Sequence, residues 1–159
     1  MKPLKLLVLV LALTAPHAAS AKEASGSGAL ALAALVARVS PLVAPPGKAA
    51  LKKFLNGQAD FKFPKGRKIT VTAGKVACRS SNVDITAHGC DLSFGTKDVK
   101  LKGRAAHELY ATLLEAGVEP NPGAGNVWVT AAKLKCVIDV DEVKAKAGGG
   151  ATCHYAASN

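Results

Sequence analysis

The sequence predicts an α+β fold of two tandem repeats, each a helix followed by antiparallel strands, which form one bent antiparallel sheet with helices on one face and one local disulfide per repeat. Three observations lead to this prediction. Val71–Cys78 (VTAGKVAC) returns as Val129–Cys136 (VTAAKLKC), with five of eight residues identical and a cysteine ending each copy. Gly103-Arg104-Ala105-Ala106 echoes Gly47-Lys48-Ala49-Ala50 at a predicted helix start. The four cysteines also fall into two equivalent pairs.

The 159 residues divide into four parts on this interpretation. A signal peptide is expected at 1–21, and a linker with an N-terminal helix at 22–46. The first repeat then covers 47–102 and the second covers 103–159. The two repeats are expected to form one domain, because the length after residue 21 suits a single core of ordinary size.

The first 21 residues have the pattern of a secretory signal peptide. Lys2 and Lys5 precede an unbroken apolar run from Leu6 to Leu13, and small residues follow at Ala19-Ser20-Ala21. The run is too short to cross a bilayer, so no transmembrane segment is expected once this leader is removed. The protein is therefore expected to be exported, to the periplasm or the extracellular space.

The segment after the signal peptide is expected to contain two helices. Lys22–Gly28 is interpreted as a short polar linker. Apolar residues recur every three or four positions in Ala29–Ser40, which predicts a helix packed on the body of the protein. Pro45-Pro46 is expected to be a stiff connection, followed by a helix from Gly47 to about Asn56.

The two copies of the repeat lie in the two long predicted strands, Lys68–Cys78 and Asn126 to about Val140. In both strands the alternation of apolar residues shifts by one position. Such a shift turns core residues outward unless the strand holds an extra residue. We therefore predict a bulge or sharp bend at Ala73-Gly74 and at Ala131-Ala132; the alternative is that each strand breaks in two there.

Shorter elements complete the prediction. A short strand is expected around Phe61–Phe63, a turn at Pro64–Gly66 and a helix from Gly103 to about Ala116. The remaining expected elements are a strand at Val83–Ala87, strands at Cys90–Phe94 and Val99–Leu101, a loop at Glu119–Gly125, a polar hairpin or loop at Glu142–Gly150, and a closing strand at Ala151–Ala156.

The cysteines are expected to be oxidised in an exported protein. The repeat favours the pairs Cys78–Cys90 and Cys136–Cys153, because each unit then carries its own bridge. The alternative is a four-cysteine zinc site. The sequence contains no Cys-x-x-Cys pair, which disfavours zinc, and no cofactor is predicted.

The chain is basic, with a formal net charge of +10 that falls to about +8 when the two leader lysines are removed. This charge favours anionic partners. Four lysines are candidates for a binding surface. Lys75 and Lys133 lie at equivalent positions of the repeat, and Lys100 and Lys102 lie just before the helix predicted from Gly103. The competing interpretation is that lysines on sheet edges only deter aggregation. Aromatic residues are few, which makes nucleic acid an improbable partner.

Trp128 is the only tryptophan and the fifth candidate for the binding surface. Its neighbours Val127 and Val129 are expected to face the core, so Trp128 projects from the opposite face of its strand. An exposed tryptophan on a rigid strand would be a binding anchor. Burial beneath the helix Ala29–Ser40 is nevertheless the favoured expectation.

Catalytic motifs are absent from the sequence, including Gly-x-Ser-x-Gly and His-Glu-x-x-His. His88 and His154 each lie near the second cysteine of a copy, so a symmetric fold would bring them together, which is the basis of the alternative of a hydrolase or metal site. His107 has no histidine partner four residues away. Asp139, Asp141 and Glu142 form an acidic cluster that is interpreted as a solvated loop rather than a calcium site.

In outline, two helix-plus-sheet units with one disulfide each are similar to the secreted beta-lactamase inhibitor proteins. This resemblance implies an inhibitor-like binding role; no functional motif is shared, so no site residue is carried over. The leading hypothesis is an exported, non-catalytic binding or inhibitor-like module that contacts a partner protein through a sheet face. The alternatives are a charge-driven binder of anionic envelope polymers or headgroups and an undetected hydrolase or metal site.

Overall fold

The computed structural model describes residues 20–57, 68–81, 84, 87–123, 125–145 and 150–157. Nearly all of the expected signal peptide therefore lies outside the described residues. The expected strand at Phe61–Phe63 and the turn at Pro64–Gly66 lie outside them too, as does most of the expected strand at Val83–Ala87.

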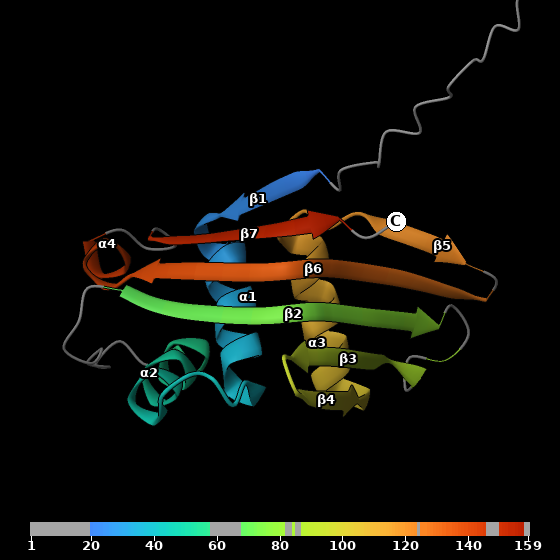
Figure 1. Cartoon of the computed structure of the whole chain (residues 1–159), viewed down its shortest axis with the longest axis horizontal. Coiled ribbons are helices and arrows are strands. Elements are labelled where there is room, and N and C mark those ends of the chain that lie inside the picture. Colours follow the sequence, from blue (N-terminus) through green and yellow to red (C-terminus); the bar gives the residue numbers. More distant parts are fainter. Residues whose placement is uncertain are drawn as a thin grey trace, which may run out of the picture.

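The elements follow one another as strands and helices of very different lengths (Figure 1). Their bounds, in chain order, are β1 (Ala21–Ser25), α1 (Gly26–Val39), α2 (Pro45–Leu55), β2 (Lys68–Ser81), β3 (Gly89–Phe94), β4 (Lys97–Lys102), α3 (Gly103–Glu115), β5 (Pro120–Gly123), β6 (Asn126–Asp139), α4 (Val140–Ala145) and β7 (Ala151–Ala157).

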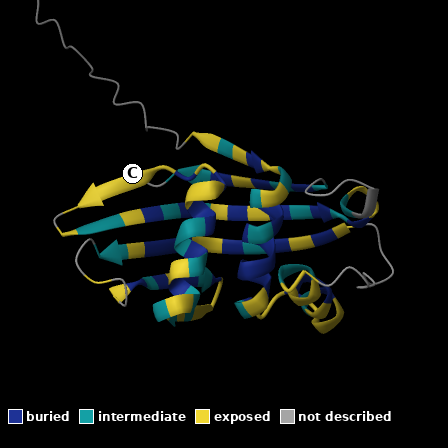
Figure 2. Ribbon diagram, turned by 180° about the vertical axis from the view of Figure 1, so that it is seen from behind, coloured by how far each residue is buried: buried dark blue, intermediate teal, exposed yellow. Residues whose placement is uncertain are grey.

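The strands form one antiparallel sheet in the order β1-β7-β6-β2-β3-β4, with β5 paired to β6 beyond the end of β7. Helices α1 and α3 lie side by side across one face of this sheet (Figures 1 and 2). Burial alternates along the strands, and the buried side chains of the sheet meet the buried side of α1 and α3 in one core. The α+β fold predicted from the sequence is thereby confirmed.

The two copies of the eight-residue repeat pair with each other at the centre of the sheet. Val71 of β2 lies opposite Cys136 of β6, and Cys78 lies opposite Val129. Each copy thus runs antiparallel to the other, with its first residue beside the last residue of its partner. The β2–β6 pair is consequently the midline of the sheet, and equivalent strands lie at equal distances on either side of it.

Both cysteine pairs are disulfide-bonded as predicted, Cys78 with Cys90 and Cys136 with Cys153. Each bridge joins residues directly opposite in neighbouring strands, β2 with β3 and β6 with β7. The two bridges therefore tie the central strand pair to its neighbour on each side.

The two halves also share the way a helix follows an edge strand. Helix α1 follows β1 at Gly26 and α3 follows β4 at Gly103, and both glycines have positive φ angles, 75° and 58°, which a side chain disfavours. Cys153 Sγ lies 3.4 Å from the carbonyl oxygen of Ala29 in α1, and Cys90 Sγ lies 3.4 Å from that of Ala106 in α3. By its place in the fold, α1 is the counterpart of α3, whereas the sequence echo at Gly47 lies in α2.

The predicted irregularity in the long strands is present. In β2 the buried Ala73 is followed by two exposed residues before the next buried residue, Val76. In β6 the buried Ala131 is likewise followed by one half-buried and one exposed residue before the buried Leu134. The pairing of β6 with β7 shifts by one residue between Ala132 and Lys135, which is a β-bulge. The β2–β6 pairing keeps its register, because both strands carry the extra residue at the same level.

Two expectations for the N-terminal region were wrong. The expected linker at Lys22–Gly28 contributes β1, which pairs with β7, and then the first residues of α1. Its polar composition reflects an edge strand whose inward residue, Ala24, is the buried one. Pro45-Pro46 is not a connection but the start of α2, because proline needs no intrahelical N–H bond in the first turn.

Two expected loops also contain regular structure. Pro120–Gly123 is the short strand β5, whose prolines are tolerated at the sheet edge. Residues 140–145 form α4, and Asp139 Oδ1 accepts hydrogen bonds from the backbone N–H groups of Asp141 and Glu142 at 3.1 and 3.3 Å. The acidic cluster is therefore a helix cap, with two carboxylates in the first turn.

Helix α1 is buried on most of its surface because it packs against the sheet, α2 and α3 at once. This explains its nearly uncharged, alanine-rich sequence, since small side chains permit close approach on several sides. None of the helices in the described ranges is both long enough and apolar enough to span a membrane.

Candidate functional site

The face of the sheet opposite α1 and α3 carries no helix in the described part of the chain (Figure 1). The exposed face of the antiparallel sheet is therefore available for contact, unlike the face beneath the two helices. We call it the open face. Its outward residues over β6, β2, β3 and β4 surround two adjoining hollows of about 640 and 430 Å³.

The two hollows share Trp128, Asp91 and Lys100 and together form one groove across four strands. The larger hollow extends toward the ends of β2 and β4, where Arg79 and Lys102 line it. The smaller one extends toward the bulge and is bordered by Lys75 and Asp98 among others. We call this feature the Trp128 groove.

Trp128 lies on the open face and is 38% exposed. The expectation that the N-terminal helix buries it was wrong, because α1 lies on the other face of the sheet, where Val129 and Ala131 point. In the strand ladder Trp128 lies opposite Arg79 of β2 on one side and Asn121 of β5 on the other. Strand β5 thus flanks the tryptophan at the end of the sheet.

Basic side chains outnumber acidic ones around the groove. Arg79, Lys75, Lys100 and Lys102 border it, against Asp91 and Asp98. The Lys100–Asp91 ion pair is long, 3.8 Å, and both side chains are mostly exposed, so it neutralises little of this charge. The groove therefore has a positive rim.

Arg79 was not among the residues that the sequence analysis singled out. Its side chain lies over Gly89 of β3, where an added Cβ atom would come within 3.2 Å of Arg79 Nε. Gly89 in turn lies between Arg79 and Lys102 in the ladder. The signal was present in the sequence, since Arg79 directly follows the buried Cys78 and so has the opposite, outward orientation.

The structure brings together four of the five candidate binding residues: Trp128, Lys75, Lys100 and Lys102. Lys133 does not line the Trp128 groove. It lies in the β6 bulge with a φ angle of 51°, the only positive φ of a non-glycine residue in the described ranges. The groove is also confined to one half of the sheet, because the repeat aligns Trp128 and Arg79 with Thr70 and Val137 in the other half.

The two histidines expected to meet do not. His154 lies on the open face of β7 with its Nδ1 atom 3.6 Å from Glu23 of β1. His88 precedes β3, and β6 and β2 lie between β7 and β3. The hypothesis that His88 and His154 share a site is therefore wrong.

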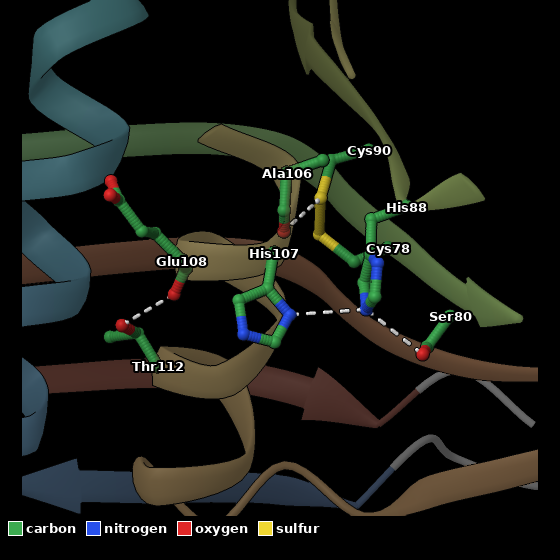
Figure 3. Close-up of a disulfide and its surroundings, with 8 residues drawn as sticks. All are labelled: Cys78, Ser80, His88, Cys90, Ala106, His107, Glu108 and Thr112. Atoms are coloured by element: carbon green, nitrogen blue, oxygen red, sulfur yellow. Dashed lines mark hydrogen bonds between the residues drawn. A yellow bond between two sulfur atoms is a disulfide. The ribbon is translucent and has the colours of Figure 1, made fainter. Parts of the chain in front are cut away.

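His88 instead contacts His107, the histidine that has no histidine four residues away in the sequence (Figure 3). His88 is 5% exposed, and its Nε2 atom lies 3.1 Å from Nδ1 of His107 and 3.0 Å from Oγ of Ser80. This is not a serine protease-like relay, in which the serine and the orienting group bind opposite nitrogens of one imidazole. Among the described residues, no three His, Cys, Asp or Glu side chains gather as metal ligands.

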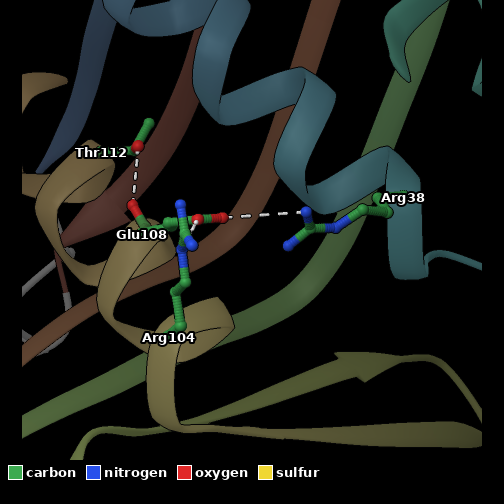
Figure 4. A network of polar contacts seen from close by, with 4 residues as sticks. All are labelled: Arg38, Arg104, Glu108 and Thr112. Atoms are coloured by element: carbon green, nitrogen blue, oxygen red, sulfur yellow. Dashed lines mark hydrogen bonds and ion pairs between the residues drawn. The ribbon is translucent and has the colours of Figure 1, made fainter. Parts of the chain in front are cut away.

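A second groove, of about 600 Å³, lies on the helix side between α1, α2 and α3. Glu108 occupies it and binds Arg104 at 3.1 Å and Arg38 at 3.8 Å (Figure 4). Thr112 Oγ1 donates a hydrogen bond to the backbone carbonyl of Glu108 at 2.8 Å. The carboxylate thus lies between the two guanidinium groups, and Lys52 also lines this groove.

The chain matches no protein-family model, and no curated protein and no solved structure is similar to it at a significant level. The outline similarity to the beta-lactamase inhibitor proteins consequently gains no support from these comparisons.

Proposed function

We propose that this protein is an exported, non-catalytic binding module, and that the Trp128 groove holds an acidic surface of a partner protein. The observation that carries the proposal is an exposed tryptophan on a central strand, bordered by four basic side chains, on a sheet face that no described helix covers. A module that blocks its partner in this way would act as an inhibitor.

The strand that carries Trp128 is held rigidly within the sheet. Trp128 lies on β6, which pairs with β2 on one side and with β5 and β7 on the other. One disulfide joins β6 to β7, and the other joins β2 to β3. A surface held in its binding conformation loses little conformational entropy when a partner docks. Tryptophan and arginine are the residue types that most often dominate the energy of protein interfaces.

The charge of the groove favours an acidic partner. The positive rim of the groove attracts an acidic partner and speeds their encounter. Export is supported by the leader-like N-terminal sequence and by two disulfides, which persist in oxidising compartments. The partner is therefore expected outside the cytoplasm.

Photo-crosslinking tests the proposal directly. A photoreactive amino acid replaces Trp128 in one variant and Leu42 in another, since Leu42 is also exposed (61%) but lies between α1 and α2. In envelope extract of the producing cells, position 128 should yield a discrete protein adduct that position 42 does not. Excess wild-type protein should suppress the adduct, and excess Trp128→Ala protein should not.

The Trp128→Ala protein should bind the cross-linked partner at least about 30-fold more weakly, a loss of about 2 kcal/mol or more. Adducts at both positions, or suppression by both competitors, would contradict the proposal. The charge-driven alternative predicts a different pattern. Wild-type and Trp128→Ala proteins would then bind a dextran sulfate column equally, and moderate salt would release both.

A further inference from the structure

We propose that an extended acidic segment of the partner protein adds to the edge of the sheet, as a strand paired antiparallel with β4. This inference rests on the proposed function, because both give the partner an acidic surface. Strand β4 (Lys97–Lys102) forms one edge of the sheet, and no described strand pairs with its outer side (Figure 1). A strand added to a sheet edge takes its affinity from main-chain hydrogen bonds and its specificity from alternate side chains.

The hydrogen-bonding pattern of the β3–β4 ladder shows which backbone groups of β4 face outward. The N–H of Gly103 donates to the carbonyl oxygen of His88 at 3.1 Å. These two residues flank the ladder pair Gly89–Lys102, which is therefore a non-hydrogen-bonded pair. Because the two kinds of pair alternate along an antiparallel ladder, every second residue of β4 from Lys102 turns its backbone groups away from β3. These residues are Lys102, Lys100 and Asp98.

The two faces of β4 determine which side chains such a segment should carry. Lys100 and Lys102 point to the open face, where they line the Trp128 groove. Val99 and Leu101 point to the core face but are only half-buried, whereas the residues of β3 opposite them are buried. Residues directly opposite in an antiparallel pair share a face of the sheet. A segment with acidic residues opposite the two lysines and apolar residues between them therefore fits both faces.

The opposite edge strand, β1, fits such a segment less well. Its core-face residues are Lys22 and Ala24, since they pair with the buried Tyr155 and Cys153 of β7. Lys22 already binds Glu119 at 2.6 Å, and Ala24 is buried. Strand β1 therefore offers an added strand no half-buried apolar side chain on its core face, unlike β4.

The charge of β4 also decides between an acidic segment and a second copy of this chain. Three of the six residues of β4 are lysines. Lysines on an edge strand oppose its pairing with the same strand of another copy, because like charges then lie close together. An acidic segment replaces this repulsion with attraction, so the charges that hinder self-association favour the proposed occupant.

A synthetic peptide tests this pairing without the partner protein. Acetylated and amidated Glu-Val-Glu-Val-Thr, in the antiparallel register, places its glutamates opposite Lys102 and Lys100. Titrated into the isotope-labelled full chain and followed by NMR, it should slow hydrogen exchange at the amide of Lys100 more than at those of Val99 and Leu101, which already bond to β3. N-methylation of both glutamates should weaken binding at least about 10-fold, and N-methylation of both valines should not, since only the glutamate N–H groups face β4.

Two charge reversals provide matched variants. Lys100→Glu should weaken peptide binding about 5-fold or more, because attraction to the opposite glutamate becomes repulsion. Lys53→Glu makes the same change at an exposed position of α2 and should alter binding less than about 2-fold. Equal losses in the two variants would mean that only net charge matters and would overturn the proposal.

Three further results would also overturn it. One is unchanged exchange at Lys100 with the peptide at millimolar concentration, and another is a glutamate-methylated peptide that binds at least as tightly as the valine-methylated one. The third is protection of Lys100 that grows with protein concentration in the absence of peptide, because a second copy would then occupy the edge. None of these results depends on the cross-link from position 128, so a failure here is distinct from a failure of the Trp128 groove.

Discussion

Tyr155 places a titratable hydroxyl group in the core. It lies on β7, almost fully buried, and pairs with Lys22 of β1 across the strand ladder. Lys22 Nζ in turn lies 2.6 Å from Glu119 Oε1. Burial raises the pKa of Tyr155 above its ordinary value of 10.0, Lys22 opposes the shift, and Glu119 adds to it. The folded protein therefore favours the neutral phenol.

This shift predicts a loss of stability at alkaline pH. The folded state holds the Tyr155 proton more tightly than the unfolded chain does, so the stabilisation is complete below the unfolded pKa of about 10 and is lost as pH rises beyond it. The free energy of unfolding, measured in urea between about pH 8 and about pH 11, should fall more steeply for the wild type than for Tyr155→Phe. Parallel decreases in the two proteins would show that another group is responsible.

Residue alternation predicted which way Trp128 points but not what lies over it. The orientation follows from the period of a strand, a local property. The cover depends on which face receives the helices, and that is decided by packing between distant segments. The contact of His88 with His107 was missed for the same reason, because the helix that carries His107 meets β3 only in the folded sheet.

Bulges bend the sheet near the middle of the paired copies of the repeat. Gly74 and Lys133 lie between the ladder pairs Ala73–Leu134 and Lys75–Ala132. β3 ends at Phe94, at this level, whereas β7 continues past it and so shows the shift in register. The repeat aligns Lys133 with Lys75, yet of the two only Lys133 has a positive φ angle.

Glycine substitution at these two lysines should have opposite effects. Lys133→Gly relieves a left-handed backbone conformation and should raise the free energy of unfolding by about 1 kcal/mol. Lys75→Gly has no such strain to relieve and should lower it by about 0.5–1 kcal/mol. Chemical denaturation of both variants checks the difference. A destabilised Lys133→Gly protein would contradict the assigned backbone conformation.

The elements recovered from the sequence are those with a strong local period. The shift in alternation at Ala73-Gly74 and Ala131-Ala132 predicted the bulges, because an extra residue keeps the core residues inward after such a shift. The alternative, a break in each strand, was wrong, since β2 and β6 each continue through this point. β1 and β5 were missed, since both are short, polar edge strands whose only signal is their partner. β1 pairs with β7 at the other end of the chain, which no local pattern can indicate.

The whole molecule is organised around the antiparallel β2–β6 pair. The repeated sequence and the cysteine positions predicted one antiparallel sheet with a disulfide in each repeat, but not that the two copies pair with each other at its centre. From the tandem repeat we predict that a gene segment was duplicated. If it was, the halves have since diverged on the open face, where one half carries Trp128 and Arg79 and the other carries Thr70 and Val137.

The most direct test of the open face as a contact surface is lysine footprinting of the complex with the partner that cross-links to position 128. Wild-type protein, free and bound, is acetylated and analysed by mass spectrometry. Binding should shield Lys75, Lys100 and Lys102, while the exposed Lys52 and Lys53 of α2 keep their reactivity. Shielding of Lys52 and Lys53 with unchanged reactivity at the other three would contradict the account.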